Sequence, residues 1–246
     1  MTKGLALNTV HEGDCLELMR DIPDGSVDMV LCDLPYGTTA CKWDTIIPFD
    51  LLWEQYERVI KSNGAIILFA KQPFTSALIM SNPKLYKYNL VWVKENHDNP
   101  LMAKKRFLNI SEDICIFYKK QCVYNPQGVL PYNKETRQGK GKSMSQRNER
   151  TPTYKQGHTN YPRNIRRYKK DRGFHPTQKP VLLCDELIKT FTNEHETVLD
   201  NCIGSGTTAV AAINANRNFI GIEQDTGYVA IARQRINDVI AAKGDE

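Results

Sequence analysis

Long hydrophobic runs are missing from this chain of 246 residues. No stretch reaches 18 consecutive apolar residues, and the N-terminus lacks the charged, apolar and small-residue pattern of a secretory signal. The sequence therefore predicts neither a membrane span nor secretion. Its 41% of hydrophobic residues is typical of a globular protein that buries one sizeable core.

Paired cysteines are also missing. The seven cysteines are odd in number and scattered, with no CxxC pair. This pattern disfavours disulfides and a structural zinc site, so we predict free thiols in a reducing compartment and no metal. Cys15, Cys32 and Cys202 lie near the motifs described below, where a small core residue is a more common role than a nucleophile.

Acidic residues are scarce in one segment. From Lys119 to Gly173 the chain has fifteen Lys and Arg against three acidic residues, a local net charge of +12. Because the whole chain carries +5, the remainder carries −7. A solvated basic face is one interpretation, but interleaved tyrosines favour binding of nucleic-acid phosphates and bases. These tyrosines are Tyr124, Tyr132, Tyr154, Tyr161 and Tyr168.

The tetrapeptide Asp33-Leu34-Pro35-Tyr36 follows an apolar run at residues 27–32. The amino nitrogen of a nucleobase is a poor nucleophile, and two acceptors on its protons would return the lone pair to nitrogen. Asp33 offers one acceptor and the Leu34 carbonyl, held by Pro35, offers another. The Tyr36 ring offers a face to an unstacked base. A strand-end turn with a capping Asp is the plainer alternative.

A glycine-rich loop lies far downstream. Residues 198–200 form a short predicted strand that leads into Gly204-Ser205-Gly206 and a helix from Thr207, and the next predicted strand ends before Glu223. Glycines let the backbone approach a ligand, and an acid in that position can accept both ribose hydroxyls. The loop departs from a dinucleotide fingerprint, so adenosine without pyrophosphate fits better. A plain structural loop remains the alternative.

These motifs together resemble the β class of S-adenosylmethionine-dependent DNA amino-methyltransferases, where the catalytic motif precedes target recognition and the cofactor loop comes last. DLPY resembles the family's DPPY, with Leu34 replacing one Pro. Three more segments resemble family motifs: Gly13-Asp14-Cys15-Leu16, residues 112–118 and His175-Pro176-Thr177-Gln178-Lys179-Pro180. The resemblance covers nearly all the chain outside residues 122–174.

The resemblance implies a role for each candidate residue. The catalytic set is Asp33, Leu34, Pro35 and Tyr36, and Thr177 and Lys179 would hold the methionine carboxylate of S-adenosylmethionine. The whole cofactor set is Asp14, Cys15, Asp33, Thr177, Lys179, Asp200, Cys202, Gly204, Ser205, Gly206, Thr207, Thr208, Glu223 and Gln224. The DNA-binding set is Arg137, Arg147, Arg150, Arg163, Arg166, Arg167, Lys169 and Lys170.

The chain is expected to divide into three parts. Residues 1–121 form the catalytic half and residues 175–246 the cofactor half. Residues 122–174 form a target-recognition insertion without helical or strand period, partly disordered without DNA.

Strands are expected at 5–10, 27–32, 65–69, 89–93, 113–118, 198–200 and 219–222. Helices are expected at 15–21, 48–60, 74–80, 180–192, 207–216 and 227–242. This alternation predicts an α/β fold with a mostly parallel, doubly wound sheet. The resemblance implies seven strands, one of them antiparallel.

The leading hypothesis is methylation of the N6 amino group of adenine in duplex DNA after base flipping. The same reaction on N4 of cytosine is the nearest alternative, followed by an RNA methyltransferase and a non-catalytic DNA-binding protein. The resemblance implies a cytoplasmic prokaryotic or phage protein of restriction-modification type. It leaves a homodimer and a cognate restriction endonuclease open as partners.

Overall fold

The computed structural model describes residues 4–37, 45–97, 100–137, 153–171, 173 and 178–244. They fall into two compact units. The first takes in the chain up to Asn125 and again from Asn164 on, and the second is Pro126–Arg163. No helix within these ranges is long and apolar enough to cross a membrane.

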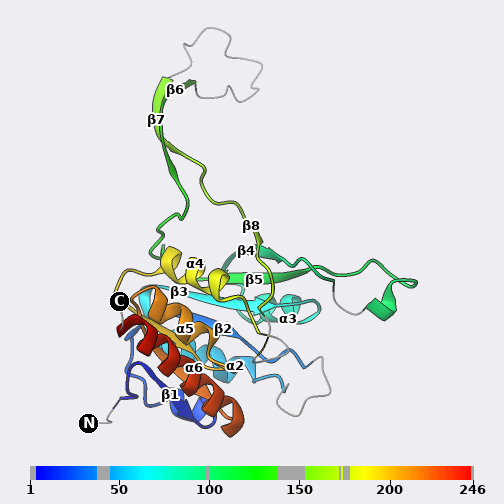
Figure 1. The fold of residues 1–246 in the computed structure, drawn as a ribbon, viewed down its shortest axis with the longest axis vertical. Helices are drawn as coiled ribbons and strands as arrows, with labels where there is room; N and C mark the ends of the chain where they lie inside the picture. The colour runs from blue at the N-terminus through cyan, green and yellow to red at the C-terminus, as the bar shows by residue number, and fades with distance from the viewer. Residues whose placement is uncertain are drawn as a thin grey trace. The chain divides into compact units, whose positions relative to one another are not determined.

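An eight-stranded sheet forms the centre of the first unit (Figure 1). Strand β5 is antiparallel to both of its neighbours, and every other pairing is parallel. Between β9 and β2 the strand order reverses, which is where open α/β sheets bind ligands. In spatial order the strands are β1 (Thr9–Glu12), β10 (Asn218–Glu223), β9 (Thr197–Asp200), β2 (Val27–Asp33), β3 (Ile60–Ala70), β5 (Ser111–Phe117), β4 (Tyr86–Val93) and β8 (Ile165–Arg167).

Helices cover both faces of the sheet. One face packs against α1 (Cys15–Met19), α2 (Phe49–Val59) and α3 (Phe74–Ser81), and the other against α4 (Val181–Phe191), α5 (Thr207–Asn214) and α6 (Thr226–Gly244).

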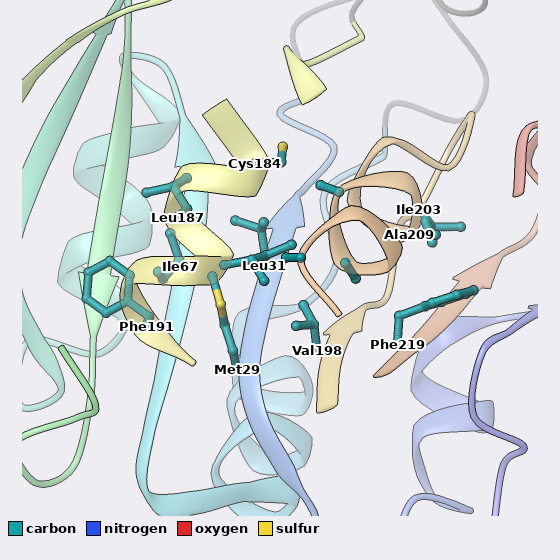
Figure 2. Packing of buried hydrophobic residues seen from close by; sticks show 14 of the residues in the cluster. Met29, Leu31, Ile67, Cys184, Leu187, Phe191, Val198, Ile203, Ala209 and Phe219 are labelled. Carbon is teal, nitrogen blue, oxygen red and sulfur yellow. The ribbon is translucent and has the colours of Figure 1, made fainter. Parts of the chain in front are cut away.

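Strand β2 shows why both faces need helices. Its residues Met29 and Leu31 join the cluster under α4, α5 and α6, shown in Figure 2, whereas Val30 and Cys32 join the cluster on the other face. Successive strand side chains point to opposite faces, so a strand buried on both sides is a nearly continuous apolar run.

The predicted fold class is confirmed, and each expected strand and helix has its counterpart in the structure. Two details differ. Strand β1 begins at Thr9 rather than at residue 5, and the sheet has an eighth strand, β8, which pairs in parallel with β4. Strand β8 is short and lies at the edge of the sheet. It is held by backbone pairing with β4 rather than by a buried apolar face, so its sequence shows no alternation of apolar and polar residues.

The second unit contains a hairpin of β6 (Leu130–Arg137) and β7 (Thr153–Thr159). The side chain of Asn160 donates to the Gly128 carbonyl at 2.7 Å beside it. The prediction that this region lacks strand structure was therefore wrong for these residues. Backbone hydrogen bonds of a two-stranded ribbon need no buried face, so its sequence carries no apolar alternation.

Candidate active site

A cavity of about 360 Å³ opens at the carboxyl ends of the parallel strands. Asp33 at the end of β2, Asp200 at the end of β9 and Glu223 at the end of β10 all line it. The cavity lies at the β9/β2 switch point. It is also lined by Asp14, Cys15, Leu34, Pro35, Tyr36, Lys179, Cys202, Gly204, Ser205, Thr207, Thr208 and Gln224. Gly206 is not among the lining residues, and Thr177 lies outside the described residues.

The Asp33 carboxylate is fixed on both oxygens. The Tyr36 hydroxyl donates to Oδ1 at 2.7 Å, and the Lys179 ammonium donates to Oδ2. The Tyr36 ring packs on Phe74 with centroids 5.1 Å apart. Burial first, and then the charge of Asp33, raises the pKa of Tyr36 well above its usual value, so the phenol stays a donor. The arrangement presents Asp33 as a rigid acceptor at the cavity wall.

Lys179 links Asp33 to a second buried carboxylate. Its Nζ lies 3.3 Å from Glu112 Oε2, and the other Glu112 oxygen pairs with Lys94 Nζ at 2.5 Å. Although burial by itself would lower the pKa of Lys179, Asp33 and Glu112 raise it above its usual value. Lys179 was expected to hold the methionine carboxylate, and here it lies between two carboxylates of the chain. We call Lys94, Glu112, Lys179 and Asp33 the charge network.

The glycine-rich loop is held from inside the fold. The Asp200 carboxylate accepts from the Cys202 amide at 3.1 Å, and burial raises the pKa of Asp200 to about 6. From α6, Arg235 donates to the Ser205 carbonyl at 2.5 Å and to its hydroxyl at 3.0 Å. Gly206, with φ of +85°, is the N-cap of α5, and a Cβ there would lie 3.1 Å from the Ala232 Cβ. The absence of a side chain at Gly206 therefore lets α5 and α6 pack closely.

The opposite rim of the cavity brings together residues from the two ends of the chain, next to the neighbouring strands β1 and β10. Asp14 accepts from the Leu16 and Glu17 amides at 2.8 and 3.1 Å, so its carboxylate caps α1 while also lining the cavity. The Glu223 carboxylate accepts from the amides of Gly204 at 2.8 Å and Asp225 at 2.9 Å. Both acids are thus fixed by backbone donors and keep lone pairs for a ligand.

The predicted DNA-binding residues are dispersed. Arg166 forms an ion pair with Glu186 on α4, and Tyr168 donates to the same carboxylate at 2.7 Å. Arg163, Arg167, Lys169 and Lys170 are exposed, and Lys169 lies 3.4 Å from Glu95. Arg147 and Arg150 lie outside the described residues, as does the side chain of Arg137. The structure therefore ties Arg166 to the fold and leaves Arg163 and Arg167 facing solvent.

The cavity is also lined by residues that were not among the predicted site residues, and two of them, Glu112 and Gln178, carry buried acceptors. Glu112 lies in β5, where the sequence predicts a strand but no site residue. An acidic residue in a buried strand is unusual and could have indicated a functional role. Gln178 is 6% exposed, and no donor in the described part of the chain lies within hydrogen-bond distance of its Oε1. A buried acceptor in a cavity suits a ligand that carries a donor.

Comparison with known proteins agrees with this geometry. A family model described as DNA methylase (N6_N4_Mtase) matches residues 27–234. The type II methyltransferase M.BglII of Bacillus subtilis is 30% identical, with 98% of this chain and 71% of that protein covered. The DNA adenine methyltransferase YhdJ of Escherichia coli is 28% identical, with 95% and 84% covered.

Solved structures give the same likeness. The complex of M1.HpyAVI with S-adenosylmethionine aligns with a TM-score of 0.65 at 26% identity, covering 93% of this chain and 98% of that one. The PvuII DNA methyltransferase, which is cytosine-N4-specific, aligns with a TM-score of 0.69 at 15% identity over 96% and 92%. At that identity the PvuII likeness shows the fold alone.

The sheet order and the cavity at its switch point define a Rossmann-like, doubly wound α/β fold. The chain belongs to the family of S-adenosylmethionine-dependent DNA amino-methyltransferases, which includes N6-adenine and N4-cytosine enzymes.

Proposed function

We propose that this DNA methyltransferase transfers a methyl group to the N6 amino group of adenine flipped out of duplex DNA. The observation that carries the proposal is the Asp33 carboxylate, fixed by Tyr36 and Lys179 at the wall of the cavity. Asp33 accepts from one amino proton and the Leu34 carbonyl from the other, which returns the lone pair to nitrogen. The proton leaves after the methyl group arrives, so no strong base is required.

The residues lining the cavity fit S-adenosylmethionine, which supplies a methyl group on a sulfonium. The carboxylates of Asp33, Glu112, Asp200 and Glu223 surround a cavity that holds one lysine, and such an excess of acid suits a cationic ligand. Glu223 would accept from the ribose hydroxyls, Asp14 would hold the adenine end, and the glycine-rich loop would hold the methionine end. Gln178 Oε1 offers one further acceptor to a ligand donor.

Around this site we propose three parts: residues 1–121 and 175–246 as the catalytic and cofactor halves of one domain, and 122–174 as the part that reads DNA. Of the predicted readers, Arg163 and Arg167 are exposed. A homodimer and a cognate restriction endonuclease are the proposed partners, and the cytoplasm is the proposed compartment.

Adenine is proposed over cytosine because members of this family that act on cytosine tend to begin the catalytic motif with Ser, whereas Asp33 occupies that position here. The test is to digest DNA methylated by the protein to nucleosides and separate them by mass spectrometry. We expect N6-methyladenine and no N4-methylcytosine. Methylcytosine alone would retain the cofactor assignment and overturn the base. Methylation of single-stranded RNA in preference to duplex DNA would favour the RNA alternative.

Gly204 provides the test of the cofactor loop. Its φ is +53°, it lines the cavity, and a Cβ there would meet no atom within 4 Å. Gly204→Asn should abolish binding of S-adenosylmethionine, measured by calorimetry, because the new side chain enters space that the ligand needs. Asn tolerates left-handed backbone better than other residues, so the fold should persist.

The matched control is Gly25→Asn. Gly25 has φ of +58° and equally open surroundings, and it is not among the residues that line the cavity. This variant carries the same backbone cost and should bind the cofactor as the wild type does. Equal affinity in both variants would show that the loop does not contact the cofactor.

A further inference from the structure

The connection between β4 and β5 carries an exposed turn, residues 100–107. It begins with the 3-10 helix η1 (Pro100–Met102). The amides of Lys105 and Arg106 donate to the Met102 carbonyl at 2.8 and 3.1 Å, which folds the residues into a compact turn. We call residues 100–107 the basic turn.

Apolar and basic side chains occur together on this turn. Leu101 is 88% exposed and Phe107 is 100% exposed. Three exposed cations, Lys104, Lys105 and Arg106, directly precede Phe107, and the turn contains no acidic residue. A surface with three cations and no carboxylate suits a polyanion better than a protein partner, and a bare aromatic ring beside phosphate-binding cations suits stacked bases.

Topology places the basic turn at the catalytic edge of the sheet. Strands β2, β3 and β4 point the same way, because β5 is antiparallel to both β3 and β4. The turn therefore leaves the edge on which Asp33 lies, and Figure 1 shows it projecting in green beyond the ends of β4 and β5. Its connection starts at Lys94, a member of the charge network.

We propose that Phe107 inserts into the base stack of duplex DNA beside the flipped nucleotide, while Lys104, Lys105 and Arg106 hold the flanking phosphates. This inference rests on the proposed function, since a base that enters the cavity must leave its stack. Apolar wedges of this kind stabilise unstacked and kinked duplexes. The free energy needed to move a base out of the duplex is larger when the base is correctly paired than when it is mismatched.

The experiment compares two duplexes that differ only in whether the target base is paired or mismatched. Single-turnover methyl transfer is measured for the wild type and for Phe107→Ala. Because base–aromatic stacking is worth about 1–3 kcal/mol, the variant should lose about fivefold to a hundredfold on the paired duplex. On the mismatched duplex it should lose far less, since the extrusion that Phe107 assists is already largely complete.

Met80→Ala is the matched control. Met80 is 72% exposed on α3, a helix that runs from the catalytic edge back toward the start of β4, so its loss should change neither rate. Equal losses of Phe107→Ala on both duplexes, or no loss, would overturn the proposal, as would a change of oligomeric state without a change in rate. If the wild type methylates neither duplex, the proposed function fails instead.

Discussion

Asp33→Asn should reduce methyl transfer by on the order of a hundredfold or more, the cost of removing one preorganised electrostatic group from an active site. The variant keeps the size of the side chain but loses the anionic acceptor that faces the amine. Incorporation of labelled methyl groups into duplex DNA measures the rate, and calorimetry measures cofactor affinity, which should fall much less. Wild-type turnover in this variant would remove Asp33 from the mechanism.

Asp113→Asn is the control for Asp33→Asn. Asp113 lies on β5 at the same edge of the sheet, where it accepts from the Thr75 hydroxyl at 2.8 Å, and it is not among the residues lining the cavity. The exchange removes the same charge at the same edge. Since Asn can still accept from Thr75, the rate should stay close to that of the wild type.

Lys179→Met should reduce both turnover and stability. It leaves Asp33 and Glu112 facing each other without the cation between them, and the loss of Lys179 removes the interaction that most lowers the pKa of Glu112. Breaking a buried pair costs about 3–5 kcal/mol, and because Asp33 is partly exposed we expect about 3 kcal/mol in the free energy of unfolding. Urea unfolding measures this loss, and methyl transfer should fall with it.

Two further variants separate charge balance from lost packing. Lys179→Met with Asp33→Asn removes one charge of each sign, leaves the Lys94–Glu112 pair intact and should recover part of the unfolding free energy. Lys61→Met breaks a pair with Asp28 at 2.6 Å in which Lys61 is 41% exposed and Asp28 keeps the Thr197 amide as a donor, so it should cost less than Lys179→Met. A double variant less stable than Lys179→Met alone would contradict an electrostatic role for the charge network.

Local patterns were sufficient to predict the helices of the first unit and every strand of its sheet except β8. Strands buried on both faces are apolar runs, and helices such as residues 181–191 have an apolar face, so each is visible in a short window. Strands β6, β7 and β8 were not predicted. Ribbon and edge strands are stabilised by backbone pairing, which any polar sequence can supply.

The site was predictable in its motifs but not in its contacts. The carboxylates Asp33, Asp200 and Glu223 each follow an apolar run, so their common edge follows from the topology. The pairing of Lys179 with Asp33 joins residues 146 positions apart, and the burial of Glu112 depends on β5 lying next to β3. The role of Gly206 in packing could not be predicted either. Its neighbour Ala232 lies on α6, and no local pattern shows that α6 packs against the start of α5.

One rim of the cavity is lined by residues from opposite regions of the chain, Asp14 and Glu223. The strands that lead to them, β1 and β10, pair with each other, and Thr226 donates to Glu12 at 2.6 Å. During synthesis at about 5–20 residues per second, the β1 segment therefore waits roughly 10–40 s before its partner β10 exists. A nascent chain cannot form this rim before β10 has been synthesised, so competence to bind the methyl donor arises only after residue 223 has left the ribosome.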